Sequence, residues 1–164
     1  MEMSLVLAPV QARQVVCRGT LARLRGDTPA ADRWNVECVE LREALVADDP
    51  KSERRAIELL LVRARICDHT DVATAAAELE RKPNLDREVL VELAQCYSQM
   101  AAGLTDGDRL RAEYLDRARG LIRRALEKGY TDRVVLETDP DLDTVRAAPG
   151  FQDILSAAAS KPGG

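Results

Sequence analysis

Apolar residues recur at helical spacing between residues 108 and 128, and charged residues occupy most of the remaining positions. The apolar positions are Leu110, Tyr114, Ala118, Leu121, Ile122, Ala125 and Leu126. A helix with one apolar face must bury that face against a neighbour. The segment before it offers a matching face made of Val89, Leu90, Leu93, Ala94, Tyr97, Met100, Ala101 and Leu104. We therefore predict an antiparallel helical hairpin over residues 86–128, with its second helix as the element around which the chain is organised.

Turn residues divide the earlier part of the chain in the same way. A first helix begins near Pro9 and ends at Gly26, with an apolar stripe along one side made of Val10, Cys17, Leu21 and Leu24. Thr28 is the predicted cap of a second helix, with Pro29 at its first position. Proline breaks further along the chain then separate three predicted hairpins, over residues 9–48, 51–82 and 86–128.

The C-terminal part has its own helix boundaries. Gly129 stands where a left-handed residue ends the sixth helix, and Tyr130 follows where an apolar side chain folds back on the last turn. Thr138 and Asp141 resemble a capping box that opens a brief helix, and Pro149 opens a last one. These elements predict a C-terminal cap over residues 131–158, followed by a flexible tail over residues 160–164.

Composition favours an all-α protein that works in the cytoplasm. Aromatic residues make up only 3% of the 164 residues, and β-branched residues form no alternating run. The formal net charge of −4 argues against nucleic acid or an anionic membrane as a partner. No stretch reads as a membrane span or a signal peptide. The four cysteines lack a CxxC pair and are predicted to be buried free thiols, which suits a reducing compartment: Cys17, Cys38, Cys67 and Cys96.

The sequence shows no pattern that predicts catalysis, a cofactor or a metal. His69, the only histidine, lies where a third helix ends and a fourth begins, and Thr70 or Asp71 is expected to cap the fourth helix. The acidic residues at positions 139, 141 and 143 alternate as in a calcium loop but lack the glycine and the final glutamate of that loop. Kinase, P-loop and G-x-S-x-G elements are also missing from the sequence. We therefore predict a protein that is not an enzyme.

Four segments resemble tetratricopeptide arrays, in particular those at the C-termini of bacterial serine/threonine protein kinases. The segments are LAQCYS at 93–98, ARGLIRRALEKGY at 118–130, DPDLD at 139–143 and PGF at 149–151. The resemblance implies a single domain over residues 1–160, built as a right-handed superhelix of about three stacked helical hairpins with a short C-terminal capping segment. It also implies a scaffold for protein–protein interaction.

In that family, the first helices of successive hairpins line an inner groove. The corresponding charged positions here form the candidate partner-binding groove: Arg13, Arg54, Arg55, Glu58, Arg65, Glu88 and Glu92. The groove would change from basic to acidic along the chain, and its basic end suits an acidic peptide. The same charges are also typical of an ordinary solvated surface.

Three functions are compatible with these observations. The first is a non-catalytic module that binds a peptide or protein partner. The second is a structural part: the C-terminal array of a larger kinase-type protein, or a homodimer formed through the N-terminal hairpin. The third, a small enzyme, lacks paired reactive groups in the sequence.

Overall fold

The computed structural model describes residues 8–66 and 69–159. Within the helices, some side chains lie outside the description: those of Ala8, Pro9, Arg13, Thr20, Arg23, His69, Ala158 and Ala159. The regular elements in the described ranges are all helical, which confirms the predicted all-α class. The chain divides into two compact units, Met1–Asp68 and His69–Gly164. The single superhelical stack of three hairpins over residues 1–160 stays a prediction.

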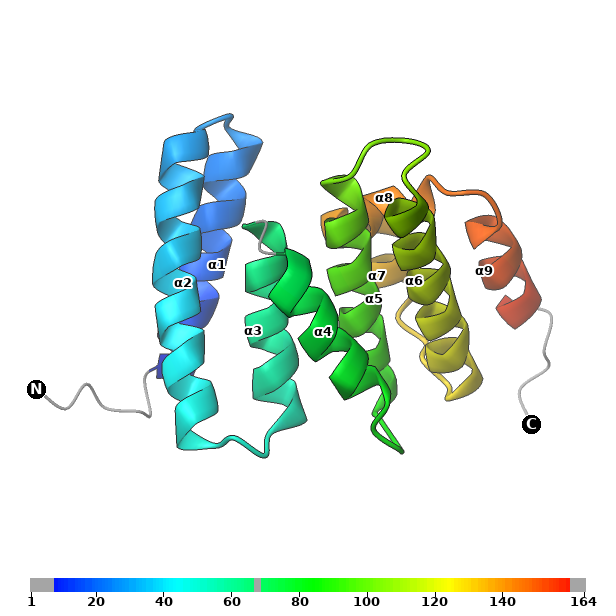
Figure 1. The fold of residues 1–164 in the computed structure, drawn as a ribbon, viewed down its shortest axis with the longest axis horizontal. Coiled ribbons are helices and arrows are strands. Elements are labelled where there is room, and N and C mark those ends of the chain that lie inside the picture. The colour runs from blue at the N-terminus through cyan, green and yellow to red at the C-terminus, as the bar shows by residue number, and fades with distance from the viewer. Residues whose placement is uncertain (1–7, 67–68, 160–164) are drawn as a thin grey trace, which may run out of the picture. The chain divides into compact units, whose positions relative to one another are not determined.

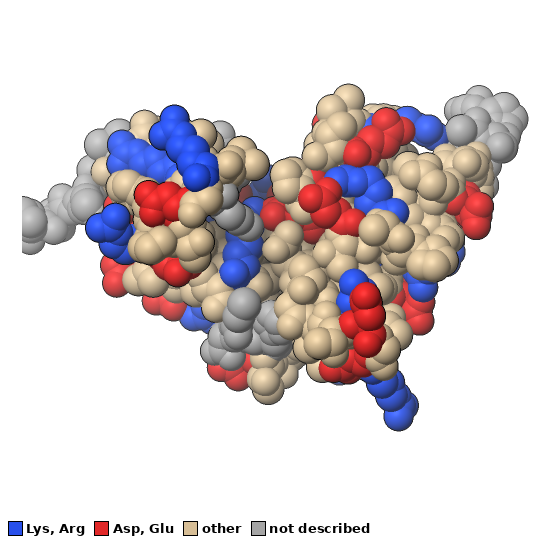
Figure 2. Space-filling view, turned by 90° about the horizontal axis from the view of Figure 1, so that it is seen from above, with Lys and Arg blue, Asp and Glu red and all other residues tan. Residues whose placement is uncertain are grey.

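The first unit contains three helices, α1 (Ala8–Leu24), α2 (Thr28–Asp48) and α3 (Glu53–Arg65). Helix α1 runs antiparallel to α2, and α3 packs against α2 (Figure 1). Val15, Cys38 and Val62 form a small core from all three helices. Figure 2 shows Lys and Arg side chains gathered at the end of this unit where α1 joins α2.

The predicted cap of α2 is wrong. Asp27, rather than Thr28, caps α2, because its carboxylate accepts a hydrogen bond from the backbone N–H of Ala30 at 3.1 Å. The apolar stripe predicted for α1 lies along one side of the helix, and that side faces outward, since Leu21 is 46% exposed and Leu24 is 78% exposed. Smaller residues make the contact with α2 instead: Ala12, Val15, Gly19 and Ala22.

The second unit contains α4 (His69–Glu80), α5 (Arg87–Ala102), α6 (Arg109–Glu127), α7 (Arg133–Thr138), the 3₁₀ helix η1 (Pro140–Leu142), α8 (Asp143–Arg146) and α9 (Phe151–Ala159). The hairpin of α5 and α6 forms as predicted. Helix α5, rather than α6, is the centre of the unit, because α4, α6, η1 and α8 all pack against it. It therefore buries residues around nearly its whole circumference, from Val89 to Ala101.

The end of α6 adopts the predicted geometry. Gly129 has a φ of +82°, and the N–H of Tyr130 donates to the carbonyl of Ala125 at 2.9 Å. The capping box predicted at Thr138 is wrong, since Thr138 is the last residue of α7, a helix that the sequence reading missed. Asp139 caps η1 instead, and its carboxylate accepts from the N–H of Asp141 at 2.8 Å.

The cysteines are only partly as predicted. Cys38 and Cys96 are buried and free, whereas Cys17 is free but exposed because it lies on the outer face of α1. Cys67 lies outside the described residues. None of the helices in the described ranges has both the length and the apolar character needed to cross a bilayer.

Two glycines of the α6 region are expected to respond in opposite ways to the same substitution. Gly120→Ala should raise the free energy of unfolding by up to about 1 kcal/mol, because Gly120 is helical and an added Cβ meets nothing within 4 Å. Gly129→Ala should lower it by about 1 kcal/mol, because alanine is strained at a φ of +82°. Urea unfolding followed by circular dichroism measures both changes. Equal effects of the two substitutions would contradict the helix ending described here.

Candidate functional site

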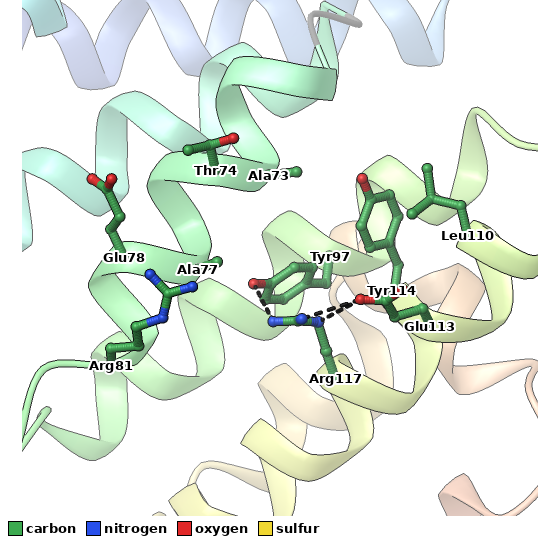
Figure 3. A pocket seen from close by; sticks show the side chains of 10 residues that line it. All are labelled: Ala73, Thr74, Ala77, Glu78, Arg81, Tyr97, Leu110, Glu113, Tyr114 and Arg117. Carbon is green, nitrogen blue, oxygen red and sulfur yellow. Dashed lines mark hydrogen bonds and ion pairs between the residues drawn. The ribbon is translucent and has the colours of Figure 1, made fainter.

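A pocket of about 300 Å³ lies within the second unit, between α4, α5 and α6 (Figure 3). Helix α4 supplies one wall, with Ala73, Thr74, Ala77 and Glu78, and Arg81 directly follows the end of this helix. Helix α6 supplies the other, with Leu110, Glu113, Tyr114 and Arg117, and Tyr97 comes from α5. Pockets of this size are at the small end of those that bind ligands, so this one suits a single large side chain or a small fragment.

The inner surface of the pocket is aromatic and its α4 wall is made of small residues. Tyr97 is 1% exposed, and its ring lies 5.8 Å from the ring of Tyr114, centroid to centroid, at an angle of 40°. Figure 3 shows both rings between the α4 wall and Leu110. Ala73 and Ala77 reach only a short way from α4, so space remains opposite the rings. Leu110 is 42% exposed, which leaves an apolar edge open to solvent.

Ionic contacts hold the polar side of the pocket. The hydroxyl of Tyr97 donates to Glu80 Oε2 at 3.1 Å, and Arg117 Nη1 donates to the same oxygen at 3.3 Å. Arg117 Nη2 donates to Glu113 Oε1 at 3.1 Å, and the guanidinium carbon lies 5.7 Å from the centroid of the Tyr97 ring. Arg117 thus links α4, α5 and α6 by charge-assisted contacts.

Both phenols of the pocket are neutral at physiological pH. Burial, together with the negative charge of Glu80, raises the pKa of Tyr97 to about 12, although the positive charge of Arg117 opposes this shift. Burial also raises the pKa of Tyr114. These tyrosines therefore offer apolar rings and a hydrogen-bonding hydroxyl, and neither is suited to act as a base at neutral pH.

The α4 rim carries two charged residues of opposite sign, Glu78 and Arg81. Neither makes a hydrogen bond or an ion pair with another residue in the described part of the chain. Figure 3 shows both side chains on the α4 side of the pocket. The pocket therefore has an aromatic inner surface and a polar edge.

Two of the predicted groove residues, Arg55 and Glu58, connect α3 to α2, and a third, Arg54, pairs with Glu58 within α3. Arg55 Nη1 donates to the carbonyl of Leu45 and to Asp48 Oδ2, both at 2.7 Å, at the end of α2. Glu58 accepts from Arg54 at 3.2 Å and also forms an ion pair with Arg42 of α2. These contacts stabilise the packing of α3 on α2, which is a structural role.

The other predicted groove residues are divided between the units. The side chain of Arg13 lies outside the description, and Arg65 is half-buried at the end of α3. On α5, Glu88 accepts from Arg87 at 2.9 Å and Glu92 is half-buried. Because the set spans both units, the continuous groove that it would form stays a prediction.

Two further sequence expectations concern metal and histidine chemistry. The side chain of His69 lies outside the description, and His69 itself is the first residue of α4. Asp139 and Asp141 each accept a hydrogen bond from a glutamine of α5, Gln95 at 3.0 Å and Gln99 at 3.1 Å. In residues 8–66 and 69–159, no group of three His, Cys, Asp or Glu side chains is arranged to hold a metal ion.

Sequence reading placed Tyr97, Tyr114 and Leu110 on apolar stripes but did not find the pocket. Arg117 was assigned only to the polar face of its helix. One sequence feature could have indicated the pocket: the residues of α4 are small, whereas α5 and α6 carry tyrosines. Small side chains that face large rings leave space between the helices. Finding the pocket required knowing that α4 packs beside the hairpin of α5 and α6.

Comparison with known proteins gives no match: neither a family model, nor a curated protein, nor a solved structure matches the chain. Membership of the tetratricopeptide family therefore stays a prediction based on the segments described above.

The raised pKa of Tyr97 predicts a loss of stability in alkali. A tyrosine in the unfolded chain ionises near pH 10, whereas Tyr97 in the folded protein ionises near pH 12. Between these pH values, unfolding therefore releases a proton. The free energy of unfolding then falls as the pH rises. The free energy of unfolding, measured in urea at pH 9 and at pH 11.5, should fall between these two pH values in the wild type. The fall should be about 2 kcal/mol larger in the wild type than in Tyr97→Phe. The other tyrosines and the lysines titrate in both proteins, so the difference isolates Tyr97. An equal loss in both proteins would show that Tyr97 is not held as described.

Proposed function

We propose that this chain is a non-catalytic helical-repeat module that binds another protein, and that its pocket between α4, α5 and α6 receives an aromatic or large aliphatic side chain of that partner. One observation carries the proposal: two tyrosine rings and an exposed leucine face a wall of small residues across an open pocket. Burial of a large apolar side chain in such a site contributes roughly 1.5–3 kcal/mol. Interfaces concentrate their binding energy in anchors of this kind.

The chemistry of the pocket supports binding over catalysis. Its phenols are neutral at physiological pH, and Arg117 is held between Glu80 and Glu113. Groups held in this way give the pocket a fixed shape, so less entropy is lost when a partner binds. Glu78 and Arg81 at the rim suit polar contacts around the anchor.

The compartment forms part of the same proposal. Cys38 and Cys96 are free thiols inside the protein. Free buried thiols suit a reducing environment, and we place the module in the cytoplasm on that ground.

Filling the pocket tests the proposal. Ala77→Phe should occupy the space opposite the tyrosines, and Ala157→Phe on the exposed side of α9 is the matched control. The first probe is N-acetyl-L-tryptophan amide, followed by NMR of methyl-labelled alanine and leucine. In the wild type and in Ala157→Phe we expect shifts at the methyl groups of Ala73 and Leu110, and in Ala77→Phe we expect these shifts to be lost.

A second pair of variants extends the test to peptides. Peptides selected from a random display library on the wild-type protein should share an aromatic or leucine anchor. Leu110→Asp should weaken their binding at least tenfold, because it places a charge at the apolar edge of the pocket. Val134→Asp, at a position 69% exposed on α7, should leave their binding unchanged. If the selected peptides bind Ala77→Phe and Leu110→Asp as tightly as the controls Ala157→Phe and Val134→Asp, the assignment of the pocket is overturned.

A further inference from the structure

Helix α1 carries a second apolar stripe, on the side that faces away from α2. Its members are Val10, Gln14, Cys17, Leu21 and Leu24, and all five are exposed. Val10, Leu21 and Leu24 are 54%, 46% and 78% exposed. The residues that contact α2 lie on the opposite side of the helix, so the stripe contributes nothing to the described core of the first unit.

The spacing of the stripe is that of a coiled-coil seam. Its successive members are separated by 4, 3, 4 and 3 residues, which corresponds to alternating d and a positions of a heptad repeat. Gln14 is the polar member of the seam. A stripe limited to these two positions is narrow, and it matches one helix better than a broad protein surface. The 17 residues of α1 span about 25 Å, so the seam is long enough for about two heptads of a partner helix.

The charged residues beside the seam are all basic. Arg18 and Arg25, the residue that follows α1, are both exposed and occupy two of the e positions, and Gln11 occupies the third. Arg13 and Thr20 occupy the g positions by register. Helix α1 contains no Asp or Glu. The guanidinium of Arg18 lies 5.1 Å from the ring centroid of Trp34, a contact that holds it near the surface of the hairpin.

Charges at the e and g positions select the partner of a coiled coil. Two copies of α1 paired through their seams would place arginines beside arginines, and this repulsion disfavours a homodimer through α1. A helix with acidic residues at its e and g positions would instead pair with Arg18 and Arg25. We propose that the outer face of α1 docks an amphipathic helix of another protein that has a leucine-type seam flanked by acidic residues.

A matched pair of synthetic peptides tests this proposal with the full chain. Each peptide has three heptads with leucine at a and d; one has glutamate at e and g, and the other has lysine there. Repulsion between like charges keeps each peptide from pairing with itself. Fluorescence anisotropy of labelled peptides should show that the glutamate peptide binds at least tenfold more tightly than the lysine peptide at low salt. The difference should shrink as salt screens the charges.

Variants place the peptide on α1. Leu21→Glu should weaken binding of the glutamate peptide at least tenfold, whereas Val36→Glu, at an exposed position on the outer side of α2, should not change it. Both residues are already exposed, so circular dichroism should show unchanged helix content. In a Cys67→Ser background, the peptide should also slow alkylation of Cys17, which is an exposed member of the seam.

Three results would overturn the proposal. The first is equal binding of the two peptides, or no binding of either. The second is binding of the glutamate peptide that Leu21→Glu leaves intact. The third is a dimer of the chain in light scattering that Leu21→Glu converts to a monomer, since the occupant would then be a second copy. The pocket variants Ala77→Phe and Leu110→Asp should leave peptide binding to α1 unchanged, so the two sites fail or succeed separately.

Discussion

Burial of α5 on nearly all sides is the constraint on which the second unit depends. A helix in this position has no solvent to satisfy its polar side chains, so each buried one must find a partner within the protein. Gln95 donates to Asp139 at 3.0 Å, and the hydroxyl of Ser98 accepts from the N–H of Val145 at 3.3 Å. The Tyr97 hydroxyl reaches Glu80 of α4. Polar residues in α5 therefore determine which elements can surround it, while its apolar residues supply the energy of packing.

The pocket follows from this arrangement. The ring of Tyr97 belongs to the core, and its hydroxyl donates to Glu80, so the inner surface of the pocket is also part of the core. The α4 wall cannot close on it, because Ala73 and Ala77 are too short to fill the space in front of the rings. Arg117 also helps to keep the pocket open, because it forms ion pairs with both Glu80 of α4 and Glu113 of α6. The open space is thus a consequence of the packing of three helices.

Local signals in the sequence were enough to predict the longer helices and several of their ends. Periodicity located the hairpin of α5 and α6, and Gly129 with Tyr130 marked the end of α6, because both depend on neighbouring residues only. Errors arose where two adjacent residues competed for one role, as with Asp27 and Thr28 at the cap of α2. The central position of α5, the pocket and the outward direction of the α1 stripe were not predicted, because they depend on which helices meet. Helix α1 shows this most clearly: it has apolar residues on two opposite faces, and the small residues, not the large ones, contact α2.

Close contact between the helices explains why α1 packs against α2 through the face that carries its small residues. Gly19 lies against Trp34 and Asn35, where an added Cβ would sit 3.4 Å from side-chain atoms of both residues. A helix that presents glycine and alanine can approach its neighbour closely, which gains many weak contacts along its length. The leucines at positions 21 and 24 are then left outside, although burying either would contribute roughly 1.5–3 kcal/mol. Large apolar residues kept at heptad spacing on an exposed face retain this free energy for a contact with another helix, and the arginines beside them restrict which helix that can be.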